Sequence, residues 1–447
     1  MRDIILLGLF CVVMLMALRS PFYAVVGYYW ISIMSLHKLT WGFAYNLPWA
    51  EIAALVTFLS VIVHFKQLQI PKARETLLFI LLWGIVTLST AGSLYPQIAW
   101  LEWQSVSKIF LMAFITMMVI TTRKQLIHFS IMIILFVGFF AVKGAIFAIL
   151  TAGQYRVWGP PGSFLQDNNY IGLAFVMIIP LCFFIRKIAE KKWISYALLV
   201  TGSAAIIATA LTYSRGALLG LVAIGFMYFL RSKNKVIIAL VGIAVISVGL
   251  SLLPGKWYDR MNTIKDYEED TSANQRINSW IFSYNIAKAY LLGGGFGCFT
   301  QEQYLLYSPD PELGMHYRSD GTIEGLTSHS IYFEVMAQQG FLGLIIYLAI
   351  LVSVFFSFRK LDRVSRKTPD AEWIAHLSRG LFVSLIGFMV CGAFISRAYF
   401  ELLWVLFAII VSFKTIVLKG DWQIENMLEQ NLTYNNAEYL RLNLNTQ

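Results

Sequence analysis

The chain has 447 residues, of which 58% are hydrophobic and only 13% are charged, and its mean hydropathy is +0.66. Soluble globular domains carry about 25% charged residues, so this composition excludes an ordinary water-soluble domain. Apolar runs long enough to cross a hydrocarbon core of about 30 Å recur along the whole length. We therefore expect an all-α, polytopic integral membrane protein.

Apolar runs predict the helices in chain order. They span residues 4–18, 22–36, 48–65, 76–94, 106–121, 126–151, 170–185, 193–212, 215–230, 235–253, 329–357, 377–396 and 399–417. The first two runs are short and are separated by Arg19-Ser20-Pro21, so they could form one broken element. We expect about 12 membrane spans.

The placement of charge predicts the orientation of these spans. The formal net charge is +10, and five short loops together hold 17 Lys and Arg against three Asp and Glu, whereas residues 254–328 hold six against ten. The five basic loops are 66–75, 122–125, 186–192, 231–235 and 359–367. Short basic loops are typically cytoplasmic. The basic excess thus indicates orientation in the membrane and does not indicate nucleic-acid binding. The connections expected on the opposite face are 37–47, 95–105, 152–169, 213–215, 254–328 and 397–400.

Two parts follow from this pattern. Residues 1–418 form the transmembrane domain, including the large outer loop 254–328, and residues 419–447 form a polar cytoplasmic tail. Within the loop, the amphipathic stretch 276–292 predicts a helix along the membrane surface, and Gly293–Gly297 should end it.

Four arginines are candidates for binding an anion. Arg215 separates two apolar runs with almost no loop between them, and a charge at membrane depth usually marks a functional site or an ion pair. The alternative for Arg215 is snorkelling to lipid phosphates. The other arginines lie on expected outer segments, where each alone could be solvated: Arg156, Arg276 and Arg318. Together their planar guanidinium groups suit a diphosphate, which needs several donors.

Two polar motifs at helix starts complete the candidate site. Asp167, Asn168 and Asn169 precede a predicted helix, which they could cap, or they could bind sugar hydroxyls or phosphate. His329 begins another predicted helix beside the outer loop. A neutral imidazole with a pKa near 6.5 can accept a proton from a sugar hydroxyl. The alternative is a histidine whose hydrogen bonds are satisfied by the backbone.

Metal and cofactor signals are weak. The acidic residues of 266–270 could hold Mg²⁺ or Ca²⁺, but they lack a fixed ligand spacing, and a solvated acidic face is favoured. Gly293–Gly297 does not follow a predicted strand, which argues against a nucleotide motif. We expect no metal and no cofactor.

Taken together, the motifs resemble the O-antigen ligase superfamily, and most closely its branch of exosortase-A-associated O-glycosylation ligases. The resemblance runs from residue 1 to about residue 415. The matching motifs are Met1-Arg2-Asp3, Trp158-Gly159-Pro160 with Phe164, Asp167-Asn168-Asn169, Ser214-Arg215-Gly216, Arg276 with Trp280, Gly293–Gly297, Ser328-His329-Ser330-Ile331-Tyr332-Phe333 and Gly340-Phe341-Leu342-Gly343-Leu344.

This resemblance implies a GT-C-type glycosyltransferase of the bacterial inner membrane. Such enzymes transfer a glycan from undecaprenyl diphosphate to an acceptor at the periplasmic face, and in O-antigen ligases the acceptor is the lipid A–core oligosaccharide and no metal is needed. Applied here, it makes His329 and Arg215 catalytic. The expected substrate-binding residues are Arg276, Arg156, Arg318, Asp167, Asn168 and Asn169. An O-antigen polymerase, a protein O-oligosaccharyltransferase and a transporter of lipid-linked glycans remain the alternatives.

Overall fold

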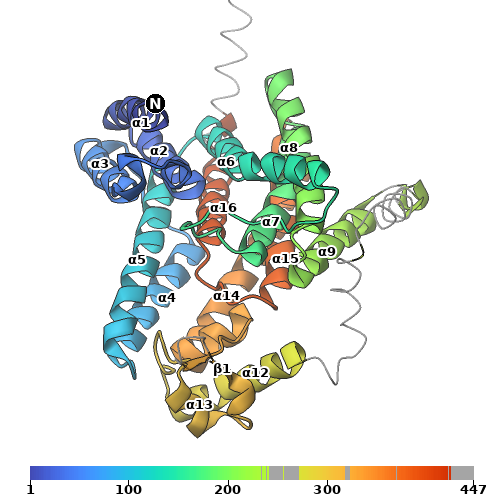
Figure 1. The fold of residues 1–447 in the computed structure, drawn as a ribbon. Coiled ribbons are helices and arrows are strands. Elements are labelled where there is room, and N and C mark those ends of the chain that lie inside the picture. Colours follow the sequence, from blue (N-terminus) through green and yellow to red (C-terminus); the bar gives the residue numbers. More distant parts are fainter. Residues whose placement is uncertain are drawn as a thin grey trace, which may run out of the picture.

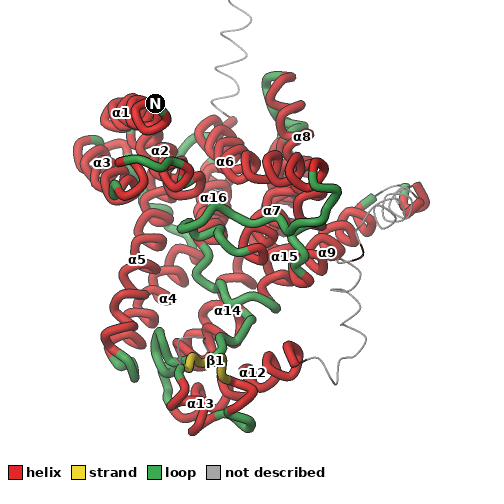
Figure 2. Tube along the Cα trace, viewed as in Figure 1, coloured by secondary structure: helices red, strands yellow, loops and turns green. Residues whose placement is uncertain are grey.

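The structure is a computed structural model that describes residues 1–232, 234–237, 239–240, 255, 271–317, 323–368, 370–420 and 422–423. These residues are mostly helical, with one small two-stranded hairpin (Figures 1 and 2). The helices are α1 (Arg2–Arg19), α2 (Pro21–Met34), α3 (Trp49–Val63), α4 (Arg74–Ala91), α5 (Pro96–Val119), α6 (Arg123–Leu150), α7 (Asn168–Ile185), α8 (Lys192–Ala210), α9 (Arg215–Arg231), α12 (Thr271–Ala289), α13 (Gln301–Tyr307), α14 (Ile331–Lys367), α15 (Glu372–Gly392) and α16 (Glu401–Lys419). Short 3₁₀ helices are η1 (Leu36–Leu39), η2 (Phe43–Asn46), η3 (Phe65–Gln67) and η4 (Glu312–Gly314), and the strands are β1 (Met315–Tyr317) and β2 (Ile323–Gly325).

Among the described residues, eight helices are long and apolar enough to cross a membrane: α4, α5, α6, α7, α8, α14, α15 and α16. The polytopic, helical character predicted from composition is therefore confirmed. The number of spans stays a prediction, because most of the expected run 235–253 lies outside the described residues. Helix α3 is apolar but shorter.

The centre of the bundle is formed by α7 and α16. In each of them, 83% of the residues in the apolar stretch long enough to cross a membrane are buried. Small residues bring α15 close to α7: a Cβ added at Gly387 would lie 2.7 Å from a Val176 methyl group. Ser384 Oγ also donates a hydrogen bond to the Met177 carbonyl oxygen at 2.6 Å. Close backbone approach and interhelical hydrogen bonds are what hold membrane helices together. These contacts fix the middle of α7 relative to α15.

Two expectations about helix boundaries need correction. Residues 96–105, expected in an outer connection, are the first turns of α5, because Pro96 occupies the start of the helix, where its missing N–H costs nothing. The first two apolar runs are separate helices, since Ser20 between α1 and α2 is extended, with φ −157°. They pack against each other, as the close approach of Val13 to Gly27 shows.

The outer-loop unit comprises α12, α13 and the hairpin, drawn at the bottom of Figure 1. It has a small core of its own, in which Phe282 stacks on Tyr304 at 4.0 Å and both pack with Ala337 of α14. The hairpin pairs Met315 with Gly325, a small departure from the all-α expectation. As expected, α12 ends before the glycine run; its placement along a membrane surface stays a prediction.

Glycines lock this unit to a kink in α14. Gly340 has φ 67° and interrupts α14, and Gly293, with φ 70°, packs directly against it. A Cβ at Gly293 would come within 2.5 Å of the Gly340 nitrogen, and both residues adopt left-handed conformations that favour glycine. The Gly294 N–H donates to the Ala337 carbonyl at 2.8 Å. The glycine run therefore positions the outer-loop unit as well as ending α12.

Candidate functional site

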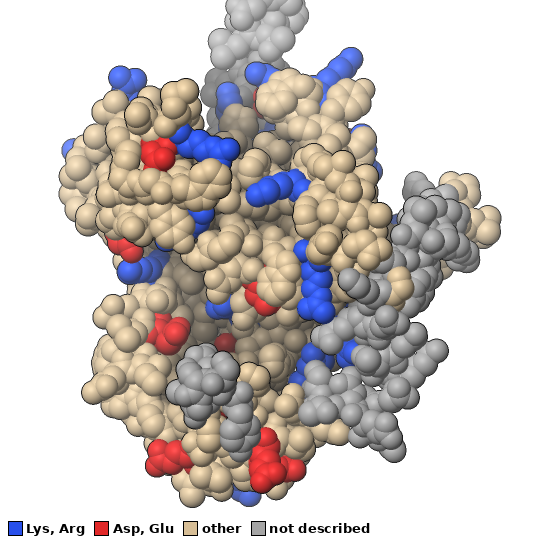
Figure 3. Space-filling view, in the orientation of Figure 1, with Lys and Arg blue, Asp and Glu red and all other residues tan. Residues whose placement is uncertain are grey.

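The candidate site lies at one end of the bundle, where α7, α9 and α14 begin and where the turn 393–400 joins α15 to α16. This turn contacts each of the three helix starts. The Cys391 thiol just before it donates to the Gly216 carbonyl of α9 at 3.0 Å, and Ser396 hydrogen-bonds Ser328 at 3.3 Å. The space-filling view shows a hollow between the helical body and the outer-loop unit, with Lys and Arg side chains along its margin (Figure 3).

The predicted motif at the start of α7 is a helix cap that also connects two helices. The Asp167 carboxylate accepts the Asn169 N–H at 2.7 Å, as an N-cap residue does. Asn168 is buried, and its side-chain amide donates to the Thr212 carbonyl at 2.8 Å, which ties α7 to the turn before α9. Asp167 therefore caps α7, as the capping alternative predicts. The side chain of Asn168 forms a hydrogen bond that holds α7 against the turn before α9. The Asn169 amide lies 3.5 Å from Asn168 Oδ1.

Arg215 is the first residue of α9 and is half-buried. The preceding turn is closely held: Ser214 caps the helix through the Ala217 N–H at 3.3 Å, and Tyr213, with φ 58°, donates from its hydroxyl to the Gly153 carbonyl at 2.8 Å. Arg156 is exposed and lies over the Tyr213 ring, 5.7 Å from its centroid. The structure thus places Arg156 beside the turn that carries Arg215.

His329 precedes α14 and has a left-handed backbone, with φ 48°. This conformation costs a non-glycine residue about 1–3 kcal/mol, and such residues cluster at functional sites. Burial lowers the pKa of the His329 imidazole below its ordinary value, the Arg276 guanidinium lowers it further, and the Asp167 carboxylate partly opposes both. Arg276 and Asp167, predicted separately from His329, thus both act electrostatically on its imidazole, which is neutral at neutral pH.

Trp280 holds α12, and with it Arg276, against the start of α14. Its ring stacks on Phe333 at 5.0 Å with an interplanar angle of 5°, and its indole N–H donates to the Ser328 carbonyl at 2.9 Å. An aromatic pair of this kind contributes about 0.5–1.5 kcal/mol beyond its buried area. Ser328 is fully buried, and its hydroxyl donates to the Ser330 carbonyl at 3.0 Å. The backbone on both sides of His329 is therefore fixed.

The turn 393–400 adds a residue that our sequence reasoning missed, Arg397. Its guanidinium carbon lies 3.9 Å from the centroid of the Tyr170 ring, in the first turn of α7. The Glu334 carboxylate of α14 accepts the Ala398 N–H at 2.8 Å and so fixes the turn. Arg397 separates two apolar runs as Arg215 does, and this same signal could have found it.

Several predicted residues cannot be placed or stand apart. Arg318 and the acidic run 266–270 lie outside the described residues. His316 is exposed on β1, where it faces Glu324 of β2. In the described ranges, no group of three or more His, Cys, Asp or Glu residues could hold a metal ion. The metal-free expectation stays a prediction.

Chemically, this end of the bundle combines a neutral imidazole with guanidinium groups from α9, α12 and the turn 393–400. The imidazole can accept a proton, and guanidinium groups can bind phosphate oxygens and stabilise negative charge that develops on them.

Two known protein families match segments of the chain. Residues 197–348 match the family described as O-antigen ligase (Wzy_C), and residues 1–190 match a family described as of unknown function (DUF5935). The first match supports placement in the O-antigen ligase superfamily and an activity of the membrane ligase or polymerase type. It spans Arg215, Arg276 and His329. No curated protein matches the chain.

Proposed function

We propose that the chain is an O-antigen ligase, which transfers a glycan from undecaprenyl diphosphate to the lipid A–core oligosaccharide at the periplasmic face of the bacterial inner membrane. One observation carries the proposal: in the segment that matches the ligase family, a strained, half-buried His329 stands in the field of Arg276. Within the superfamily, the order of the sequence motifs favours the branch of exosortase-A-associated O-glycosylation ligases.

In the proposed reaction, the acceptor hydroxyl gives its proton to the neutral imidazole of His329. The hydroxyl oxygen forms a bond to the anomeric carbon of the donor sugar, and the bond from that carbon to the diphosphate oxygen breaks. Undecaprenyl diphosphate leaves with the electron pair, and Arg215 and Arg276 stabilise its negative charge. Attack on the side opposite to the leaving group inverts the anomeric configuration.

The remaining polar residues would position the two substrates. Arg397, which contacts Tyr170, lies where it could add a donor for the diphosphate. We assign contacts with sugar hydroxyls to Asn169 and Arg156, and we keep Arg318 as a binding residue on the sequence motif alone. Asp167 would act on His329 through its charge.

Transfer by the purified protein tests the proposal. Lipid-linked glycan is supplied together with rough lipopolysaccharide, with an acceptor protein or with neither. Glycosylated lipopolysaccharide is the expected product. Glycosylated protein would show a protein O-oligosaccharyltransferase, and a longer lipid-linked glycan without added acceptor would show a polymerase. Movement of the donor across vesicles without any transfer would show a transporter.

Orientation in the membrane is a separate part of the proposal. Some of the outer connections predicted to share one face lie together: the Tyr95 hydroxyl donates to the Glu302 carboxylate at 2.8 Å, and the rings of Phe164 and Phe400 lie 5.4 Å apart. We propose that this face is periplasmic and that the chain end after Lys419 is cytoplasmic. A reporter fused after Lys419 that is active only in the periplasm would reverse this orientation.

We also propose that transfer needs no divalent metal, because guanidinium groups supply the positive charge at the leaving diphosphate. Transfer should continue in excess EDTA. Loss of transfer in EDTA with recovery in Mg²⁺ or Mn²⁺ would point instead to the acidic residues 266–270.

A further inference from the structure

A second cavity, of about 700 Å³, lies between α7, α9, α14 and α15 at the end of the bundle opposite the candidate site. The chain order fixes this placement. Helices α7, α9 and α14 begin at the candidate site and α15 ends there, whereas residues near their other ends line the cavity. Nothing in the proposed glycan transfer uses this cavity.

Positive charge dominates its lining. Five cationic side chains line it: Lys187, Arg231, Arg359, Arg366 and Arg379. The lining contains one carboxylate, Asp362, which pairs with Arg366 at 2.8 Å. Within the described part of the chain, the other four cations form no ion pair. This excess of cations suits an anionic ligand.

Aromatic rings form the apolar part of the wall and support the arginines. Arg231 lies over the Phe382 ring at 4.4 Å, and Arg359 lies over the Phe355 ring at 4.7 Å. Phe184 and Tyr228 stack at 5.2 Å on the same wall. Cations held over ring faces keep their N–H donors available at the edges of the guanidinium plane. The cavity therefore places planar donors next to apolar surface, as an amphiphile requires.

A neighbouring basic cavity, lined by Arg74, Lys414 and Lys419, differs in this respect. There Lys414 donates to Glu75 at 2.6 Å, Lys419 donates to Gln69, and Arg74 donates to Ser353 at 3.0 Å. Three of the five cations that line that cavity thus have side-chain partners, and its described lining contains no aromatic ring, so the aromatic cavity is the better candidate.

We propose that the cavity between α7, α9, α14 and α15 binds the headgroup of an anionic phospholipid, with its phosphate among the arginines and its first acyl carbons on the aromatic wall. The source is the cytoplasmic leaflet, so the inference rests on the proposed orientation of the chain. Basic pockets between membrane helices on that side bind anionic headgroups. A lipid fits better than free phosphate, because free phosphate would leave the aromatic wall unused.

Binding to the purified full-length protein in neutral detergent tests this inference. Native mass spectrometry would compare phosphatidylglycerol with phosphatidylethanolamine for the wild type, for Arg231→Gln/Arg379→Gln and for a control, Lys191→Gln/Lys192→Gln, whose lysines are exposed near the same end of the bundle. Phosphatidylglycerol should bind the wild type and the control equally, and the arginine pair variant roughly tenfold or more weakly. It should also raise the unfolding temperature of the wild type.

Three results would overturn the inference: equal binding of both lipids, equal losses in the two pair variants, or displacement of phosphatidylglycerol by millimolar inorganic phosphate. If the arginine pair variant does not fold, Lys187→Gln and Arg359→Gln, made singly, replace it and should each weaken binding severalfold. The measurement involves no glycan transfer, so its failure is independent of the proposed reaction.

Discussion

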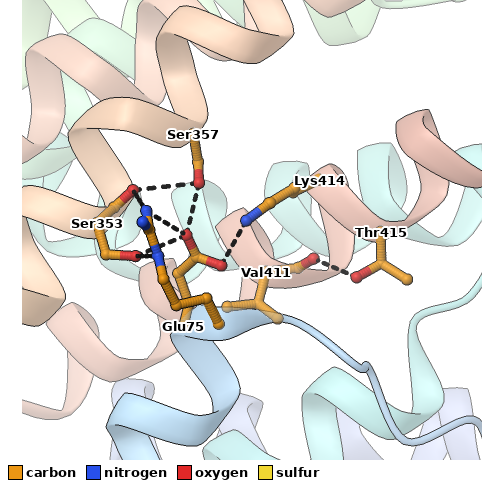
Figure 4. Close-up of polar contacts among 7 residues, drawn as sticks. Glu75, Ser353, Ser357, Val411, Lys414 and Thr415 are labelled. Carbon is orange, nitrogen blue, oxygen red and sulfur yellow. Dashed lines mark hydrogen bonds and ion pairs between the residues drawn. The ribbon is translucent and has the colours of Figure 1, made fainter.

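The carboxylates at the two ends of the helix bundle have different kinds of hydrogen-bond partners. Near one end, Glu75 is fully buried and accepts hydrogen bonds from Lys414 at 2.6 Å, from Ser353 at 2.7 Å and from Ser357 at 2.6 Å (Figure 4). These partners join α4, α14 and α16. A buried carboxylate is tolerated in an apolar surrounding only when it is paired and hydrogen-bonded, and this one is.

At the other end, the carboxylates of Asp167 and Glu334 accept backbone N–H groups and so fix the start of α7 and the turn 393–400. Arg215, Arg276 and Arg397 come from different elements and are half-buried, and His329 is strained. The carboxylates of this end therefore hold the backbone in place around cations and an imidazole. Such an arrangement suits an anionic substrate, whereas the Glu75 cluster holds helices together.

The largest effect on transfer should come from His329→Ala. General base catalysis contributes about 10²–10⁴-fold, so turnover should fall by about that factor. His316→Ala is the matched control, because His316 is exposed on β1, and it should transfer like the wild type. Rates would be measured with purified protein and lipid-linked glycan. If His316→Ala were inactive and His329→Ala active, the assignment of His329 as the catalytic histidine would be wrong.

Replacing an arginine should have a similar or slightly smaller effect. Arg276→Ala or Arg215→Ala should slow transfer by about 10²–10³-fold, the usual loss when one stabilising donor is removed. Lysine at either position should restore only part of the rate, since it lacks the bidentate fork. Lys288→Ala, an exposed position on the same helix as Arg276, should be neutral. Full activity of both arginine-to-alanine variants would remove the phosphate-binding role.

The Glu75 cluster should respond in stability alone. Lys414→Ala removes the nearer cation from a buried carboxylate and leaves only the exposed Arg74 at 3.8 Å, so it should cost about 3–5 kcal/mol of folding free energy. The transfer rate per folded molecule should stay unchanged. Lys419→Ala is the control, because Lys419 bonds an exposed glutamine side chain. Thermal unfolding in detergent measures the stability. If the transfer rate of Lys414→Ala fell as far as that of His329→Ala, the Glu75 cluster would not have a purely structural role.

The smallest effect is a shift in pH dependence. Because the pKa of His329 is lowered, transfer should persist at neutral pH and fall only below pH 6.5, as the imidazole becomes protonated. The Asp167 carboxylate raises that pKa, so Asp167→Asn, which keeps a capping side chain, should move the acid limb of the pH–rate profile to lower pH. An acid limb that moves to higher pH in Asp167→Asn would contradict the assignment of Asp167 as a neighbour that raises the pKa of His329.

The sequence predicts the helical membrane fold because apolar runs must be buried in lipid or protein, and the runs that the structure describes do become helices. It also identifies His329, Arg276 and Asp167 separately. That Arg276 and Asp167 both act on His329 depends on packing between α7, α12 and α14, which hydropathy does not encode. The hairpin and the helical start of α5 were missed because neither lies within an apolar run.

Long-range partners explain the other omissions. Arg397 separates two apolar runs in the sequence, but its contact with Tyr170, more than two hundred positions earlier in the chain, follows only from the fold. The pairing of Glu75 with Lys414 joins residues 339 positions apart. A charge inside an apolar run shows that a partner or a ligand is needed, but the sequence does not show which of the two the fold supplies.

The most direct test of the central claim measures donor binding and single-turnover transfer on the same His329→Ala preparation, with undecaprenyl-diphosphate-linked glycan and rough lipopolysaccharide. Donor affinity should stay close to that of the wild type, because the arginines that hold the diphosphate are intact, and transfer should slow by about 10²–10⁴-fold. Transfer at the wild-type rate, or slow transfer caused only by lost donor binding, would contradict the central claim.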